Sequence, residues 1–348
     1  PHLSYDYLTE KLKGFGFTHL ESISDSRYIY RLKRHIIQES IYGVDIDSSA
    51  IDIARLRLWL SLVVDEDDLD PIETLPNLDY KIVCGNSLIG LPEGAMRDLQ
   101  VEAELEKLKD KFYDITNEKE KKALRKQINA KIRELLDSAE TFAGYKIDFD
   151  FKLFFSEVWR EKGGFDVVIG NPPYVQIKQI REQDKEIFKK LFRFANGRFN
   201  LFYLFVEISP KISNKKGVTS LIIPDRILLN TQCGDIRKWL IKENDLIEID
   251  SFENQIFANA VVDSVILIFK NQKPINEFFL SRYNCTLGTL LSTKANIIPN
   301  NYVLHSPSNQ FDLNYDYATD LTIRKIRENS VHLEIIGDTK DGIIQSKI

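Results

Sequence analysis

The chain has 348 residues, of which 43% are hydrophobic and 28% are charged, as is typical of a globular protein with a sizeable core. No apolar run approaches the roughly 18 residues that cross a bilayer, and no signal-peptide pattern opens the chain, so we expect no membrane contact. The formal net charge of −5 argues mildly against nucleic-acid binding, because phosphate contacts come from Lys and Arg.

The three cysteines, Cys84, Cys233 and Cys285, lie far apart in the sequence. Their spacing matches neither a metal-ligand set nor a disulfide framework, which predicts no metal site and favours a reducing, cytoplasmic environment. The chain starts at Pro1 rather than Met, and we therefore expect it to be a fragment of a longer protein.

Residues 41–64 predict a strand, a turn and a helix. A short β-branched run ends in acidic residues, and Asp47 or Ser48 is placed to cap the helix that follows. Apolar residues then recur at helical spacing: Ile51, Ala54, Leu58 and Leu62. Residues 79–90, DYKIVCGNSLIG, predict a buried strand that ends at Cys84 and Gly85.

Residues 101–139 differ from the preceding segments in their hydrophobic pattern. Apolar residues recur at steps of three and four among many Lys and Glu. This pattern predicts two amphipathic helices, broken near Thr116 and Asn117. We interpret them as a helical hairpin inserted, at about residues 91–150, between two strands of a sheet.

Three further apolar, β-branched runs predict strands: FDVVIG at 165–170, GVTSLIIPDRIL at 217–228 and VVDSVILIFK at 261–270. Their alternation with helical stretches predicts an α/β domain with a mostly parallel sheet, in which ligands bind at the carboxyl ends of strands. Residues 175–216 hold ten Lys or Arg against four Asp or Glu, which favours a solvated helix face. Beyond about residue 275 the pattern weakens, and we expect a domain boundary there.

The strongest indication of a catalytic site directly follows the FDVVIG strand. It is the motif Asn171, Pro172, Pro173 and Tyr174. The lone pair of an exocyclic amine on a nucleobase is delocalised, so attack on a methyl group requires acceptors for both amine hydrogens. The Asn171 side-chain oxygen and the Pro172 carbonyl can accept them, because two prolines stiffen the loop. Tyr174 supplies a flat face for a base extruded from a duplex.

The alternative is an ordinary Asn-Pro turn. Four specified residues occur by chance roughly once in a thousand chains of this length, at average residue usage. The strand FDVVIG, which we expect to be buried, immediately precedes the motif and supplies the context that the catalytic interpretation requires.

FDVVIGNPPYV is similar to motif IV of the adenine-N6 DNA methyltransferases, especially type IIG restriction–modification enzymes and the methyltransferases of phage-exclusion systems. Other runs resemble further family motifs in order: YGVDID motif II, KIVCGNSL motif III, FNLFYLFVE motif V, SLIIPDRIL motif VI, and IFANA to VILIF motif VIII. The resemblance spans roughly residues 35–348. It implies a Rossmann-like sheet that binds S-adenosylmethionine.

The resemblance also implies roles for individual residues. Asp45 would hold the ribose hydroxyls of the cofactor, with Ile46 against its adenine, and Asn86 would accept a hydrogen bond from the adenine amine. Phe257 would be a second aromatic against the flipped base. The alternatives are a helix cap for Asp45 and a core position for Phe257.

The implied activity is methyl transfer to adenine N6 in double-stranded DNA, within a restriction–modification or phage-defence system. We expect residues 1–275 to form the catalytic domain and 276–348 a linker and the start of a target-recognition domain, with a nuclease domain elsewhere in type IIG relatives. The family's glycine loop, DxxxGxG, is missing, since GFGF at 14–17 lacks its acid and its strand, so we expect a fold truncated at both ends. Two alternatives stay open: an amino-methyltransferase acting on RNA or protein glutamine, and a non-catalytic scaffold.

Overall fold

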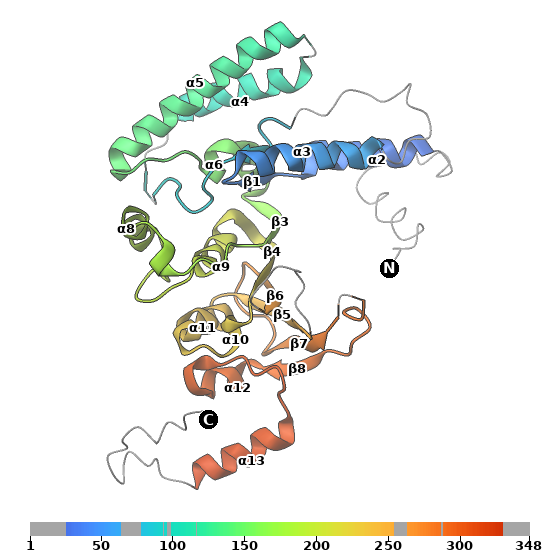
Figure 1. The fold of residues 1–348 in the computed structure, drawn as a ribbon, viewed down its shortest axis with the longest axis vertical. Helices are drawn as coiled ribbons and strands as arrows, with labels where there is room; N and C mark the ends of the chain where they lie inside the picture. The colour runs from blue at the N-terminus through green and yellow to red at the C-terminus, as the bar shows by residue number, and fades with distance from the viewer. Residues whose placement is uncertain are drawn as a thin grey trace, which may run out of the picture. The chain divides into compact units, whose positions relative to one another are not determined.

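The structure is a computed structural model that describes residues 26–63, 78–92, 94–95, 99–115, 117–253, 263–286 and 288–329. The chain divides into two compact units, Pro1–Glu161 and Lys162–Ile348. In Figure 1 the first unit runs from blue to green and the second from green to red. No helix within the described ranges is long and apolar enough to span a membrane.

The first unit contains α2 (Ser26–Ser40), β1 (Gly43–Asp45), α3 (Ser48–Val63) and β2 (Ile82–Cys84). β1 and β2 pair in parallel, with Asp45 opposite Cys84. A parallel pair requires a long crossover connection, and α3 forms part of it. The carboxyl ends of the two strands therefore meet at one edge.

Helix α3 begins as the sequence predicts. The Asp47 carboxylate accepts a hydrogen bond from the Ser49 N–H at 2.8 Å, which satisfies one of the free donors of the first turn. The predicted apolar stripe packs inward, since Ile51 and Leu62 are buried in one cluster with Ile37, Leu78 and Ile82. The predicted buried strand, β2, is also confirmed.

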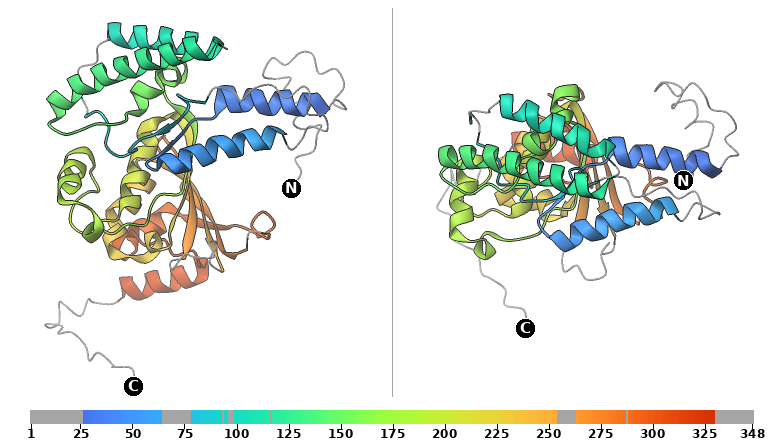
Figure 2. Two further views of the ribbon diagram at one scale, coloured as in Figure 1. Left: turned by 45° about the horizontal axis from the view of Figure 1, so that its top comes forward. Right: turned by 90° about the horizontal axis from the view of Figure 1, so that it is seen from above.

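The predicted helical hairpin is α4 (Leu99–Asp114) and α5 (Glu118–Ala143), which lie side by side in Figures 1 and 2. The Asn117 side chain caps α5 by accepting from the N–H groups of Lys119 and Glu120, so the break falls where the sequence predicts it. The two helices bury a shared apolar core: Leu105, Phe112, Ile128, Ile132 and Leu136. Lys131 pairs with Glu104 at 2.9 Å across the hairpin.

The hairpin is joined to the short helices α6 (Phe151–Phe154) and α7 (Ser156–Lys162). Lys109 is almost fully buried, and its ammonium group donates to the Phe154 carbonyl at the end of α6. Burial lowers the pKa of Lys109, because the charged form loses its hydration. The hairpin is therefore fixed to the rest of its unit by a buried polar contact as well as by apolar packing.

The second unit is built on β3 (Phe165–Gly170), β4 (Ser213–Pro224), β5 (Asp245–Phe252), β6 (Ser264–Lys270), β7 (Phe278–Cys285) and β8 (Asn296–Pro299). These strands form one sheet in the order β3-β4-β6-β5-β7-β8. The pairs β3–β4 and β5–β7 are parallel, whereas β6 runs antiparallel to both β4 and β5, and β8 is antiparallel to β7.

The α/β class is thus confirmed, but the sheet is mixed rather than mostly parallel. The connection between β5 and β6 is too short for a crossover helix, so β6 returns antiparallel and inserts between β4 and β5. A second correction concerns β3, which the sequence predicts to be buried. β3 is the edge strand of the described sheet, and Val167 and Ile169, which point to the same face of the strand, are 61% and 78% exposed.

Helices of the second unit are α8 (Glu182–Leu191), α9 (Leu201–Ile212), α10 (Arg226–Leu229), α11 (Gly234–Lys242), α12 (Asn300–His305) and α13 (Tyr317–Glu328), with 3₁₀ turns at Ile177–Gln179, Thr231–Cys233 and Pro307–Asn309. In Figure 1, α9, α10 and α11 lie on one side of the sheet. Arg237 of α11 is fully buried and donates to the carbonyl oxygens of Ile227, Ser308 and Asn309. This contact ties the segment after β8 to α10.

The boundary predicted near residue 275 falls between β6 and β7. Because β7 pairs with β5 and with β8, the described residues beyond that point continue the same sheet. A division of the chain at residue 275 stays a prediction.

Candidate active site

The Asn171–Tyr174 loop starts where β3 ends. Since β3 and β4 are parallel, with Gly170 opposite Leu221, the loop emerges at the edge of the sheet where β4 also ends. Asn171 and Pro173 are exposed, Pro172 is buried and Tyr174 is half-buried. The buried proline anchors the loop, and the Asn171 side chain remains accessible.

The side chain of Tyr174 is held by two neighbouring strands. Its hydroxyl lies 3.3 Å from the Ile222 carbonyl of β4, to which it donates, and 3.2 Å from the Ser264 hydroxyl at the start of β6. Ser264 is buried. The ring of Tyr174 is therefore held by the sheet at its hydroxyl end.

The segment that follows Tyr174 is held by the residues that lead into α9. Gln176 and Asn200 form an isolated antiparallel bridge, in which the Ile177 N–H donates to the Phe199 carbonyl at 3.2 Å. The Leu201 N–H also donates to the Val175 carbonyl at 3.0 Å. The loop is thus fastened at one end to the sheet and at the other to the start of α9.

Two acids that the sequence analysis did not single out lie at the same end of the sheet. Asp225 follows β4 directly, and its N–H donates to the Asp263 carbonyl at 2.9 Å. Burial, and then the charge of Asp263, raises the pKa of Asp225 above its usual range. Asp225 could have been found from the sequence, because it is an acid immediately after a buried apolar strand. No sequence pattern marks Ser264 as a residue of the site.

The cofactor residues expected from the sequence meet at the edge formed by β1 and β2. The Gly85 N–H donates to the Asp45 carbonyl at 2.9 Å, which places Asn86 beside the end of β1. One Asp45 carboxylate oxygen accepts from the Asp47 N–H at 2.8 Å, and among the described residues its other oxygen has no partner. Ile46 is 72% exposed, which is unusual for so apolar a side chain.

The Asn86 side chain is already partly engaged, because its amide oxygen accepts from the Leu88 N–H at 3.0 Å. An amide oxygen has two acceptor sites, so a second donor can still bind. A free carboxylate oxygen, an exposed apolar side chain and an amide at one strand edge fit the ribose and adenine of S-adenosylmethionine. Phe257, the second aromatic expected against a base, lies outside the described residues.

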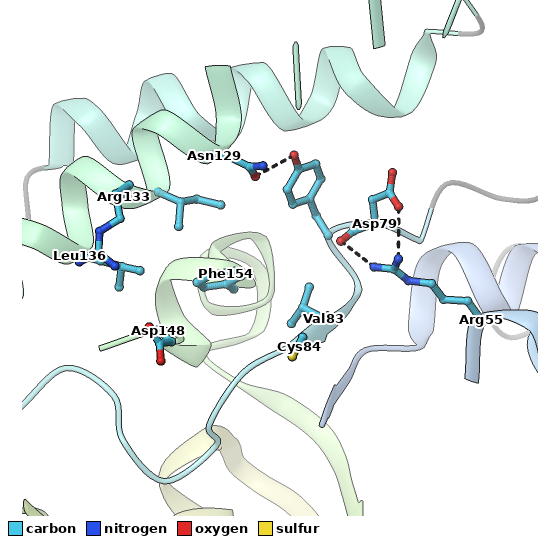
Figure 3. A pocket seen from close by; sticks show the side chains of 11 residues that line it. Arg55, Asp79, Val83, Cys84, Asn129, Arg133, Leu136, Asp148 and Phe154 are labelled. Carbon is cyan, nitrogen blue, oxygen red and sulfur yellow. Dashed lines mark hydrogen bonds and ion pairs between the residues drawn. The ribbon is translucent and has the colours of Figure 1, made fainter. Parts of the chain in front are cut away.

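A separate cavity of about 320 Å³ lies in the first unit, beside β2 and beneath α5 (Figure 3). Its lining residues are Arg55, Asp79, Tyr80, Val83, Cys84, Asn129, Ile132, Arg133, Leu136, Asp148 and Phe154. At one end Arg55 pairs with Asp79, and the Tyr80 hydroxyl donates to the Asn129 side chain. Neither Asp45 nor Asn86 lines it. The expected cofactor residues therefore form an open surface at the strand edge rather than the wall of this cavity.

Residues 39–257 match the family model described as Eco57I restriction-modification methylase. A putative type II restriction enzyme and methyltransferase of Methanocaldococcus jannaschii is 27% identical over 72% of this chain and 27% of its own length. A type II restriction enzyme and methyltransferase of Escherichia coli is 25% identical over 75% of this chain and 22% of its own length. The chain thus spans about a quarter of the length of these curated relatives.

Among solved structures, a putative class I S-adenosylmethionine-dependent methyltransferase from Listeria monocytogenes matches with a TM-score of 0.33 and 14% identity, over 82% of this chain and 75% of that one. A nuclease-deletion mutant of the Type ISP restriction-modification enzyme LlaGI matches with a TM-score of 0.46 and 12% identity, over 90% of this chain and 24% of that one. Since the family model covers well over half of the residues, the chain belongs to the Eco57I restriction-modification methylase family.

Proposed function

We propose that this chain provides the catalytic machinery for methyl transfer from S-adenosylmethionine to the N6 amine of adenine in double-stranded DNA, in a restriction–modification system. The observation that carries the proposal is the Asn171–Tyr174 loop. It stands at the carboxyl end of β3, with the Asn171 side chain exposed and the Tyr174 ring fixed by two strands. Family membership supports the same reaction class.

Asn171 and Pro172 activate the amine. The Asn171 side-chain oxygen and the Pro172 carbonyl accept the two amine hydrogens and draw the nitrogen toward tetrahedral geometry, which frees its lone pair. S-adenosylmethionine, when bound, supplies an electrophilic methyl group and a neutral thioether leaving group. Because the acceptors belong to a stiff loop, little reorganisation is needed during the reaction.

The first unit holds the cofactor in this proposal. The free Asp45 oxygen accepts from the ribose hydroxyls, Ile46 covers the adenine ring, and the Asn86 amide oxygen accepts from the adenine amine. A charged acceptor for hydroxyl groups forms a stronger hydrogen bond than a neutral one. Asp45 is therefore the main polar determinant of cofactor affinity.

Tyr174 receives the target base. An adenine inside a duplex is out of reach, so it must leave the stack and be held by aromatic and polar groups. The hydroxyl contacts of Tyr174 orient its ring for stacking, and Phe257 is the proposed second aromatic. Residues 1–275 would form the catalytic domain, and residues 276–348 would form a linker and the start of a target-recognition domain. Such an enzyme acts where bacterial DNA lies, in the cytoplasm.

A first alternative keeps the chemistry and changes the acceptor to RNA or to a glutamine amide of a protein, since each presents a planar conjugated NH₂ group. A second is a scaffold without activity. Restriction enzymes among the relatives favour DNA, and the accessible Asn171 favours catalysis over a scaffold.

The test is methyl transfer by the full-length protein from radiolabelled S-adenosylmethionine to duplex DNA, followed by nucleoside analysis. We expect label in N6-methyladenine, and label that accumulates on the order of 10²–10³-fold more slowly with the Asn171→Ala protein. Label in N4-methylcytosine would refute the adenine assignment. Label in RNA or in glutamine, with none in DNA, would establish the first alternative.

A further inference from the structure

The basic segment after the Asn171–Tyr174 loop contains two kinds of cation. Five of its ten cations are neutralised by acids: Arg181 by Asp184, Lys185 by Glu182, Lys189 by Glu186, Arg193 by Glu243 and Lys211 by Glu207. These pairs engage every acid between residues 175 and 216. They make α8 a solvated, charge-balanced helix, as the sequence analysis expects for this segment.

The other five are Lys178, Lys190, Arg198, Lys215 and Lys216. Of these, Lys178 and Arg198 lie nearest in the sequence to the bridge between Gln176 and Asn200. Both are exposed, and neither forms an ion pair within the part of the chain that the structure describes. Lys178 belongs to the 3₁₀ turn Ile177–Gln179, and Arg198 precedes the residues that begin α9. Their positive charges are therefore available to an external anion.

The backbone places Lys178 and Arg198 on neighbouring segments. The Ile177 N–H donates to the Phe199 carbonyl at 3.2 Å, Lys178 is the next residue after Ile177, and Arg198 is the residue before Phe199. Like charges held on neighbouring antiparallel segments repel each other. An anion bound between them would relieve that repulsion.

The position of Lys178 and Arg198 indicates which anion they would bind. Lys178 lies on the segment that follows Tyr174, and Arg198 lies on the segment bridged to it before α9, near the exposed Asn171. A base that enters this site stays covalently joined to its sugar and to the phosphates on either side. Cations beside the site meet those phosphates first, and Arg and Lys are the residues that bind them most often.

We propose that Lys178 and Arg198 form a clamp for the backbone phosphates that flank the target nucleotide. The inference rests on the proposed DNA substrate. Arg198 provides a planar fork for two phosphate oxygens, and Lys178 provides a point charge. The clamp holds the sugar–phosphate backbone while the base is extruded, and it reads no sequence.

The test is the salt dependence of DNA binding. The full-length protein, with Lys178→Gln, Arg198→Gln or both, is titrated against a fluorescent duplex at several salt concentrations. Each phosphate contact that is lost should reduce the slope of log K against log salt by about 0.9, and the double variant should lose about 1.8. Melting temperatures should stay unchanged, because both side chains are exposed.

Lys215 and Lys216 provide the matched control. They are exposed and form no ion pair in the described residues, but they lie near the amino end of β4, opposite the end that carries the loop. Lys215→Gln with Lys216→Gln removes the same charge as the double variant and should leave the slope unchanged. An equal fall in slope for both double variants would overturn the clamp, since it would reflect net charge alone.

The same protein preparations separate this inference from the proposed function. If the wild type methylates DNA but the Lys178 and Arg198 variants keep the full slope, the clamp is wrong and the function stands. If the wild type methylates no DNA, the proposed substrate is wrong, whatever the slopes. A slope change with RNA but not with duplex DNA would also overturn the clamp.

Discussion

The two candidate sites lie at the carboxyl ends of two parallel strand pairs, but they are supported differently. The edge that carries Asp45 and Asn86 ends a pair of three-residue strands, and its side chains are held by local backbone N–H groups. The loop from Asn171 to Tyr174 ends a parallel pair in a six-stranded sheet. Distant residues of β4, β6 and the start of α9 fix it.

This difference matches the two tasks that we propose for these sites, cofactor binding and amine activation. Cofactor binding needs exposed polar and apolar groups that can adjust to a ligand. Amine activation needs acceptors held within about 0.5 Å of their productive positions, which only a packed support provides. We therefore expect changes at the β1–β2 edge to raise the KM for the cofactor, and changes at the Asn171–Tyr174 loop to lower kcat.

The largest effect should come from Asn171→Ala. The change removes one of two acceptors for the amine, and loss of such a preorganised hydrogen bond lowers kcat on the order of 10²–10³-fold. Cofactor affinity should barely move, because Asp45 and Asn86 are untouched. The measurement is single-turnover methylation together with calorimetric titration of S-adenosylmethionine. Methylation within a few fold of wild type would remove the amine-activation role.

A smaller effect, on binding rather than rate, should follow Asp45→Ala. Loss of a hydrogen bond to a charged group costs about 1.5–3 kcal/mol, which raises the cofactor Kd roughly ten- to a hundredfold and leaves kcat at saturation close to wild type. The matched control is Asp47→Ala, two residues away, which removes a helix cap and costs about 1 kcal/mol of stability. Equal loss of affinity in both variants would show that Asp45 acts through the fold.

The features that the sequence predicted correctly are set by near neighbours in the chain. The cap at Asp47, the hairpin break before Asn117 and the parallel pairing of the strands that end at Asp45 and Cys84 follow from capping chemistry, helical spacing and sheet topology. Each depends on residues a few positions apart or on one general rule of sheet topology.

The features that could not be predicted from the sequence depend on the pairing of strands that are far apart in the chain. Tyr174 bonds to Ser264, which lies 90 residues later, because β6 inserts next to β4. No local pattern marks Ser264 as a partner. The buried Arg237 likewise takes its role from carbonyls of Ser308 and Asn309, more than 70 positions away. Strand order decides such contacts, and hydrophobic periodicity does not encode strand order.

The support of the Tyr174 ring can be tested separately from the ring itself. Tyr174→Ala removes base stacking, worth roughly 1–3 kcal/mol, and should sharply reduce flipping of a fluorescent adenine analogue. Tyr174→Phe keeps the ring but loses hydroxyl contacts of about 1 kcal/mol, so methylation should fall only a few fold. Ser264→Ala should reproduce the Phe effect, and the double variant should be little worse than either one. Fully additive losses would mean that Ser264 does not orient the ring.

The smallest expected effect concerns Asp225, and it appears in stability. Its pKa is raised in the folded protein, first by burial and then by Asp263, so its stabilising contribution is present below the unfolded pKa of about 3.9 and is lost as pH rises through the folded value. Asp225→Asn should therefore raise the Tm at pH 7, and this gain should shrink as the pH is lowered toward 4. Asp263→Asn removes only the second cause and should give a smaller gain at pH 7. A Tm difference between Asp225→Asn and wild type that is the same at both pH values would show that the buried charge is not responsible.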